Sequence, residues 1–295
     1  FEKKININLM KKELIKLILK NKKKNDYFLT ADLGFSVLEE LKKKLKDKLI
    51  NVGVSENNMM LLATGLATTL PKYKIFVYSI SSFMILRNIE IIRNFIYNDN
   101  VNNIRLIGVG SGASYSEMGK THYNFEDINI LNGFKNILIL NPANKKELNF
   151  VFKKFNESVN CIYYRINKNL KDLNFKFKRK KNIFDKKRKR KNIISSGSIL
   201  NYLPQVLGEK KFLSSNIISI PILDSKYFDD IRKFLINDDV YCVTDAIEPV
   251  IFYKLKNKIP IKKFKIFEPK LNNIKRVGSE LDVLNQAGLK KFFYD

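Results

Sequence analysis

Short apolar runs alternate with amphipathic stretches along the first half of the chain, and this alternation predicts strands and helices in turn. Several of the apolar runs end in glycine, serine or asparagine, which is typical of a strand that leads into a loop. Between them, apolar residues recur at helical spacing, as in the stretch from Phe35 to Leu49. The predicted strands cover residues 26–34, 49–56, 74–80, 103–112, 136–142 and 161–166, and the predicted helices cover residues 35–49, 57–70, 83–97 and 144–155.

Alternating strands and helices with short connections are typical of a parallel sheet that is covered by helices on both faces. We therefore expect an α/β fold whose first part is a doubly wound parallel sheet. In such sheets, ligands bind beside the carboxyl ends of the strands. Asp32, Glu56, Ile80 and the loop from Ser111 to His122 each follow a predicted strand. These positions predict one functional site on a single edge of the sheet.

A strongly basic segment separates the two halves of the chain. Residues 176–191 hold eleven Lys or Arg against one Asp, a composition that cannot build a core and predicts a solvated linker. Contact with nucleic acid or an acidic partner is the alternative for this segment. We expect a first α/β domain at residues 1–166, a basic linker at 167–191 and a smaller α/β domain at 192–295. The elements predicted for the second domain are a strand and glycine turn at 192–200, strands at 218–223 and 239–245, and helices at 224–236 and 278–293.

The formal net charge of +26 is typical of proteins that bind nucleic acids. However, Lys, Asn, Ile, Phe and Tyr are all abundant and Trp is absent, as expected from an AT-rich coding sequence. Lysines spread over solvated faces need no ligand, so we do not expect nucleic-acid binding as the main role.

The sequence lacks the features that direct a protein into a membrane or out of the cell. No apolar run reaches 18 residues, so we expect no membrane-spanning helix. The N-terminal stretch is interrupted by lysines and lacks the apolar block of a signal peptide. The chain starts with Phe1, which indicates a truncated or processed sequence. Cys161 and Cys242 stand apart, outside any metal-ligand spacing, and we expect buried, reduced thiols in a cytoplasmic protein.

Most familiar catalytic motifs are missing. We find no Walker A motif, no dinucleotide-binding glycine fingerprint, no HExxH and no paired CxxC. Because the chain has a single histidine, a multi-histidine metal site is excluded, and we predict no metal site on this chain.

Three segments remain as candidates. Glu56 is a lone carboxylate between a predicted buried strand and a buried helix, where it could relay protons. Its structural alternative is a helix start in which Ser55 caps the helix and Glu56 interacts with the dipole. Phe83 stands at a strand-to-helix junction, where it could stack on a ring or simply belong to the core. His122 lies on a long glycine-rich loop, an unusual place for a purely structural histidine.

In this order, these segments resemble the pyrimidine-binding domain of transketolases. The nearest branch is that of separate C-terminal subunits encoded with surface-polysaccharide sugar genes. The second half is similar to the C-terminal domain of the same family. The residues that carry the resemblance are Ala31–Ser36, the segment around Glu56, Phe83–Arg93, the His122 loop, Asn141–Asn144 with Glu147, Ile193–Ser198, Gly278–Glu280 and Ala287–Leu289.

The resemblance implies a transferase that depends on thiamine diphosphate and moves a two-carbon ketol unit between sugars. By this resemblance, Glu56 bonds to the aminopyrimidine ring of the cofactor and activates the cofactor. Phe83 aligns with the aromatic residue that stacks on the pyrimidine, and Asp32 with an aspartate that contacts the cofactor.

The substrate side follows from the same resemblance. His122 aligns with the histidine that holds the substrate oxygen and exchanges a proton with it. Ser36 and Tyr115 are further expected substrate contacts. Met118 and Asn141 stand where metabolic transketolases carry an aspartate and a phosphate-binding arginine, so we do not expect ordinary sugar-phosphate specificity.

The GDG…N motif that binds Mg²⁺ and the diphosphate in this family is absent from the chain. The resemblance therefore implies a separate N-terminal subunit that carries this motif, in an α2β2 assembly.

Two other interpretations stay open. The chain could be the beta-type subunit of another thiamine enzyme, such as a 2-oxo acid dehydrogenase or a deoxyxylulose-phosphate synthase, although the THYNFED segment disfavours the first and the synthase carries both halves on one chain. It could also be a non-catalytic basic binding protein.

Overall fold

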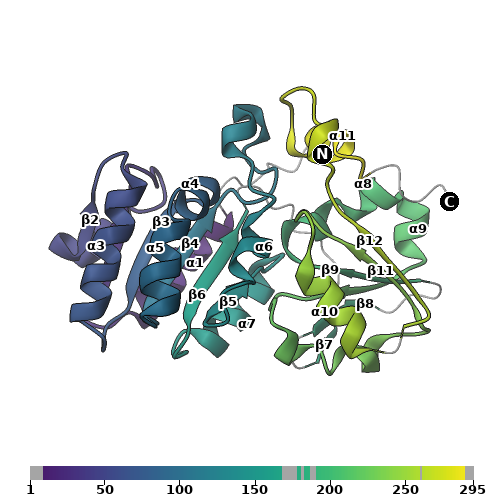
Figure 1. Cartoon of the computed structure of the whole chain (residues 1–295), viewed down its shortest axis with the longest axis horizontal. Helices are drawn as coiled ribbons and strands as arrows, with labels where there is room; N and C mark the ends of the chain where they lie inside the picture. Colours follow the sequence, from purple (N-terminus) through teal and green to yellow (C-terminus); the bar gives the residue numbers. More distant parts are fainter. Residues whose placement is uncertain (1–8, 168–177, 181–182, 187–190, 260, 290–295) are drawn as a thin grey trace.

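The computed structural model describes residues 9–167, 178–180, 183–186, 191–259 and 261–289. Two sheets lie beside each other in the molecule (Figure 1). The first has the strand order β2-β1-β3-β4-β6-β5, and all of its pairings are parallel. Its strands are β1 (Tyr27–Thr30), β2 (Leu49–Asn51), β3 (Ile75–Ile80), β4 (Ile104–Val109), β5 (Ile137–Leu140) and β6 (Cys161–Ile166).

Helices cover both faces of this sheet because each strand is apolar on both sides. Phe28 and Phe76 pack against one set of helices, whereas their neighbours Leu29 and Val77 pack against the other. The first set is α1 (Leu9–Asn21), α2 (Glu39–Leu45) and α7 (Lys145–Phe155); the second is α3 (Glu56–Thr69), α4 (Ser81–Leu86), the π-helical turn η2 (Ile92–Asn98) and α6 (Asp127–Leu131). The predicted doubly wound α/β architecture is confirmed.

The second sheet has the order β12-β11-β9-β10-β8-β7. Four strands pair in parallel, and β8 and β7 continue the sheet antiparallel. Both antiparallel strands come from the segment that we predicted as a linker, most of whose other residues lie outside the described part of the chain. The strands are β7 (Lys178–Lys180), β8 (Ile183–Lys186), β9 (Asn192–Ser195), β10 (Asn216–Ser219), β11 (Asp239–Val243) and β12 (Lys263–Phe267).

Helices also pack on both faces of the second sheet. One face carries α10 (Val250–Lys258). The other carries the 3-10 turn η5 (Gly197–Tyr202), α8 (Leu203–Leu207), α9 (Glu209–Leu213) and α11 (Glu280–Gln286). The predicted division at residues 166 and 192 stays a prediction, and below we call residues 191–289 the second part of the chain.

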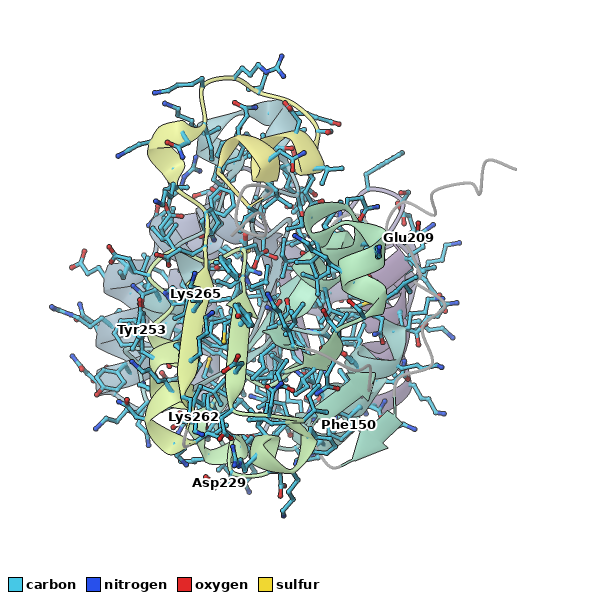
Figure 2. The ribbon with its side chains drawn as sticks, turned by 90° about the vertical axis from the view of Figure 1, so that its right-hand side faces the viewer. Phe150, Glu209, Asp229, Tyr253, Lys262 and Lys265 are labelled. Atoms are coloured by element: carbon cyan, nitrogen blue, oxygen red, sulfur yellow. The ribbon has the colours of Figure 1, made fainter. Side chains whose placement is uncertain are left out.

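Lysines line the open edge of the second sheet. Lys262 precedes the edge strand β12, and Lys265 lies within it (Figure 2). Both side chains are exposed. Charged side chains on an edge strand discourage pairing with another chain. Part of the high positive charge therefore has a local structural use.

One predicted helix is interrupted. Residues 83–97 form the end of α4, the short helix α5 (Ile89–Ile91) and the π-helical turn η2 instead of one helix. The cause is Asn88, which is fully buried. Its side-chain amide donates to the carbonyl oxygens of Phe83 and Met84, at 3.2 and 3.0 Å, in place of backbone donors.

A second predicted helix is wrong. Residues 224–236 form the 3-10 turns η6 (Ser225–Tyr227) and η7 (Ile231–Phe234). Phe228, Ile231 and Phe234 are its buried apolar residues. Their spacing of three fits the three residues per turn of a 3-10 helix.

Both cysteines are free and buried, as predicted. Within the described residues, no helix combines the length and apolarity needed to cross a membrane.

Candidate active site

The candidate residues follow the carboxyl ends of neighbouring parallel strands. Asp32 comes after β1, Glu56 opens the helix after β2, and Phe83 lies in the first turns of α4, directly after β3. The glycine-rich loop that carries His122 follows β4. Because these strands are parallel and adjacent, all four segments emerge on the same edge of the sheet.

Glu56 is buried, with 5% of its side chain exposed. Its Oε2 accepts a hydrogen bond from Arg87 Nη1 at 2.8 Å. Among the described residues, no hydrogen bond reaches Oε1. Ser55 is the N-cap residue of α3 and Glu56 lies in the first helical turn, as the structural alternative expects, but the Ser55 side chain makes no capping hydrogen bond. The arrangement leaves a buried carboxylate that is held from one side only.

Phe83 contacts both His122 and Arg87, and Arg87 in turn bonds to Glu56. The guanidinium carbon of Arg87 lies 4.0 Å from the centre of the Phe83 ring, a cation–π contact. The Phe83 ring also meets the His122 ring edge to face, with ring centres 5.0 Å apart. The structure thus brings three predicted residues into one cluster, joined by an arginine for which we predicted no role. Arg87 stands one helical turn after Phe83, which is the signal that could have identified it.

His122 is half-buried at the end of a short 3-10 turn (η4, Lys120–His122). Its Nδ1 lies 2.9 Å from Thr121 Oγ1. Burial, and then the positive charge of Arg87, lower the pKa of His122 below its ordinary value. The imidazole is therefore neutral over more of the physiological pH range and can accept a proton.

The loop before His122 folds back on itself around Tyr115. Gly110 has a φ of +73°, and a Cβ at this position would lie 1.9 Å from the Tyr115 ring. The ring of Tyr115 lies 6.4 Å from that of His122. Its hydroxyl accepts a hydrogen bond from Lys11 Nζ in α1, at 3.1 Å. Tyr115 therefore supports the loop with its ring and is anchored by its hydroxyl.

Asp32 and Ser36 lie on the same edge but outside this cluster. Both are exposed and both have positive φ values, 51° and 59°. The backbone N–H of Asp32 donates to Asn51 Oδ1 at 2.8 Å. In the described structure, neither residue contacts Glu56, Phe83 or His122. Their predicted roles require a ligand that bridges the space between.

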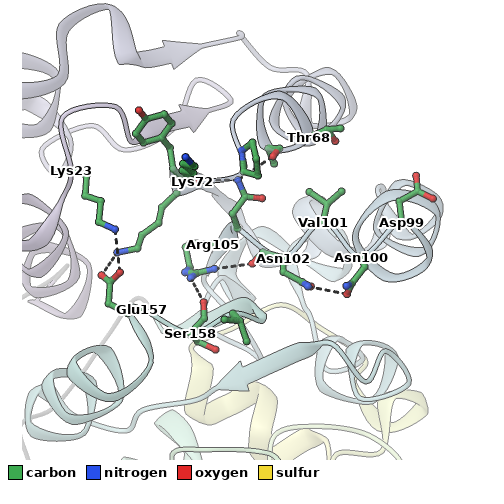
Figure 3. Close-up of a pocket in the computed structure, with 16 residues that line it drawn as sticks. Lys23, Thr68, Lys72, Asp99, Asn100, Val101, Asn102, Arg105, Glu157 and Ser158 are labelled. Atoms are coloured by element: carbon green, nitrogen blue, oxygen red, sulfur yellow. Dashed lines mark hydrogen bonds and ion pairs between the residues drawn. The ribbon is translucent and has the colours of Figure 1, made fainter.

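One cavity lies beside these elements, and another lies away from them. One, of about 540 Å³, adjoins the His122 loop and is lined by Lys120, Tyr123 and Phe125 on one side and by Leu271 and Ile274 on the other. The other, of about 480 Å³, lies at the opposite edge of the first sheet (Figure 3).

Two of the cations that line that second cavity, Arg105 and Lys74, already have partners within the protein. Arg105 donates to the carbonyl oxygens of Asn102, Ser158 and Asn160. Lys74 pairs with Glu157. We therefore do not include this cavity in the candidate site. Within the described residues, no three His, Cys, Asp or Glu side chains are grouped as metal ligands.

Comparisons with known proteins agree with this geometry. The chain resembles a protein from Actinobacillus succinogenes that is named as a subunit of an apulose-4-phosphate transketolase, with 32% identity over 42% of this chain and 39% of that protein. A protein of the same name from Phocaeicola vulgatus is 27% identical over 46% of this chain and 43% of its own length. The matched segment thus spans less than half of each relative.

The fold is shared with a solved structure described as "Split gene transketolase, inactive beta4 tetramer". The TM-score is 0.66, with 18% identity, and 96% of each chain is covered. Residues 12–170, more than half of the 295-residue chain, match the family described as "Transketolase, pyrimidine binding domain". The chain therefore belongs to the transketolase pyrimidine-binding domain family.

Proposed function

We propose that this chain is the C-terminal subunit of a split transketolase, a cytoplasmic enzyme of carbohydrate metabolism that transfers a two-carbon ketol unit between sugars. The proposal depends on one observation. A buried carboxylate, Glu56, shares the carboxyl edge of the sheet with Phe83 and His122. The names of the curated relatives support this activity.

Thiamine diphosphate fits the residues present. Glu56 Oε1, to which no described residue donates a hydrogen bond, is available to a pyrimidine ring nitrogen. The half-buried ring of Phe83 offers an aromatic face, and Asp32 lies on the same edge. When bound, the cofactor supplies a carbanion-stabilising ylid. The role of Glu56 is to hold and exchange the proton on the ring nitrogen, and Phe83 packs against the ring.

His122 acts on the substrate. Because its pKa is lowered, it is neutral near pH 7 and can accept a proton from a substrate hydroxyl before returning it. The half-exposed Arg87 neutralises Glu56 until a ring replaces or shares that contact. Ser36 and Tyr115 are proposed as further substrate contacts.

A partner subunit completes the site. The GDG…N motif is absent from the sequence, so Mg²⁺ and the diphosphate are assigned to an N-terminal subunit, in an α2β2 assembly. Exposed apolar side chains on the segments around Glu56 and Phe83 support such a partner. They are Val54, Leu61, Leu62, Leu86 and Ile89, which are 78%, 49%, 37%, 41% and 42% exposed.

The substrate is a ketose outside ordinary sugar-phosphate metabolism. Asn141, which stands where metabolic relatives carry an arginine, is buried, and its Nδ2 donates to Ser196 Oγ at 3.0 Å. It therefore offers no charge to a phosphate group.

The test is reconstitution with the N-terminal subunit and an assay of thiamine-dependent ketol transfer from a ketose. Glu56→Gln keeps the size of the side chain but removes the proton exchange, and we expect a loss of about 10²–10⁴-fold in kcat. Glu209→Gln, an exposed carboxylate on α9 labelled in Figure 2, is the control and keeps full activity. Undiminished transfer by Glu56→Gln contradicts the proposal. Oxidative decarboxylation of a 2-oxo acid in place of transfer identifies a dehydrogenase subunit instead.

A further inference from the structure

A buried ion cluster joins the first sheet to the second part of the chain. At its centre is Arg165 on β6, whose side chain is 0% exposed. Its Nε donates to Asp127 Oδ2 at 2.9 Å, and its Nη1 donates to both carboxylate oxygens of Asp245, at 2.9 and 3.0 Å. Asp127 opens α6 in the first part, whereas Asp245 follows β11 in the second. One guanidinium thus binds a carboxylate from each part.

The buried charges of this cluster are paired and hydrogen-bonded. Tyr163 adds a hydrogen bond from its hydroxyl to Asp127 Oδ2 at 2.7 Å. Buried charges are tolerated when they are paired and hydrogen-bonded. Two carboxylates share one guanidinium, so the site keeps a neutral ion pair if either carboxylate becomes an amide. The fold is therefore expected to tolerate Asp245→Asn.

The cluster lies under both ends of the loop that carries His122. Gly112 and Asn124 close this loop with two backbone hydrogen bonds, at 2.9 and 3.0 Å. Arg165 Nη2 donates to the Asn124 carbonyl oxygen at 3.3 Å. Gly112 has a φ of +60°, and a Cβ there would lie 2.3 Å from Asp245 Oδ2, so the carboxylate packs directly against the loop backbone.

The second part also touches the same loop near its tip. Ser116 Oγ donates to the Gly278 carbonyl oxygen at 2.7 Å. A Cβ on Gly119 would lie 3.5 Å from Val277, which places this segment beside the turn before His122. Figure 1 shows the yellow segment that leads into α11 next to the loop after β4. The loop is therefore held at its base and near its tip by the second part of the chain.

We propose that the second part of the chain positions His122, through Asp245 at the base of the loop and the Gly278 carbonyl near its tip. Asp245 and Ser116 are positioning residues, since neither touches His122. The inference rests on the proposed function for the role of His122, but the geometry that it concerns is independent of that role. Without these two contacts, the loop no longer holds the His122 ring in place beside Phe83 and Arg87.

The single histidine of the chain allows a direct test. The full chain labelled with [¹⁵N]histidine gives one imidazole spin system, which is titrated by NMR alone and in complex with an unlabelled partner subunit. The variants are Ser116→Ala and Asp245→Asn. The control is Ser195→Ala, which removes a comparable buried bond, 2.9 Å long, from Ser195 Oγ to the Val243 carbonyl oxygen inside the second part.

We expect the imidazole pKa to rise toward its ordinary value of about 6.5 in both loop variants, because a loosened His122 leaves its buried place beside Arg87. In the reconstituted enzyme, kcat falls about tenfold to a hundredfold, and the KM for thiamine diphosphate stays constant. Ser195→Ala changes neither quantity.

Two results overturn the inference. One is an unchanged imidazole titration in both folded loop variants. The other is an equal change in Ser195→Ala, which would indicate a general effect of lost stability. If no ketol transfer is found in the wild-type complex, the proposed function fails, but the imidazole titration still decides whether the second part holds the loop.

Discussion

Glu147 provides a quantitative test of the structure through the dependence of stability on pH. This carboxyl group is fully buried in the first turn of α7. Burial raises its pKa from an ordinary 4.5 to about 7, although the Ala143 N–H, which donates to Oε2 at 2.7 Å, acts in the opposite direction. Between these two values the folded chain holds a proton that the unfolded chain releases. Stability therefore falls as the pH rises from about 4.5 to 7, and it levels off above that.

The size of this effect follows from the same numbers. Each pKa unit corresponds to about 1.36 kcal/mol, so a rise from 4.5 to about 7 costs about 3 kcal/mol of folding free energy above pH 7. Glu147→Gln retains an acceptor for the Ala143 N–H but cannot ionise. We expect the variant to match the wild type near pH 4.5 and to exceed its stability by up to about 3 kcal/mol at pH 8.

The assay is urea denaturation of both proteins at several pH values, with Glu209→Gln as the exposed control. The quantity of interest is the difference between variant and wild type, since other carboxylates contribute equally to both. A difference that does not change between pH 4.5 and 8 would refute the reasoning.

Three further predictions concern other sites. Glu280 accepts hydrogen bonds from Asn167 and Tyr202, and burial raises its pKa to about 7. We therefore expect a second decrease of stability over the same pH range, which Glu280→Gln removes in the same denaturation series. Arg87→Gln raises the pKa of His122, because it removes the nearby positive charge; titration of the single imidazole measures this, and an unchanged value contradicts it. Asn144→Ala removes the side-chain cap of α7 and costs about 1 kcal/mol in thermal or urea unfolding, whereas no loss would show that the cap is dispensable.

Much of the first sheet was predictable because buried parallel strands read as continuous apolar runs. The runs at 74–80 and 161–166 match β3 and β6 closely. The helix predicted at 144–155 begins one residue later, after its cap at Asn144. Prediction failed where one side chain overrides the local pattern. Asn88 ends α4 by taking two carbonyl oxygens, and such competition is invisible in the spacing of the apolar residues around it.

The second part was harder to predict because its elements are short and depend on contacts made elsewhere. Strand β12 was missed since lysines occupy its exposed positions, Lys263 and Lys265, which interrupts the apolar pattern that marks a strand. The edge position explains the composition, but only after the sheet is known. The helix α10 and the N-terminal helix α1 were also missed, the latter because its lysines obscured an apolar face that includes Leu14 and Ile18.

For the candidate site, the sequence identified the edge of the sheet and most of the residues, but not how they are coupled. Glu56, Phe83 and His122 were predicted on separate strand ends, and parallel topology explains why they meet. Arg87 was not assigned a role, because its spacing of one helical turn from Phe83 indicates that these two side chains can meet but not that Arg87 also bonds to Glu56. Yet it contacts Glu56 directly and lies against the ring of Phe83.

This coupling has a consequence for cofactor capture. A ring nitrogen that bonds to Glu56 must use Oε1 or compete with Arg87 for Oε2. Arg87 is 49% exposed, so water can solvate its guanidinium when the contact opens, but Glu56 is only 5% exposed and needs the ring nitrogen as a new partner when Arg87 leaves. Because Arg87 bonds to Glu56 and its charge lowers the pKa of His122, its removal is expected to affect both the activation step proposed for Glu56 and the titration of His122.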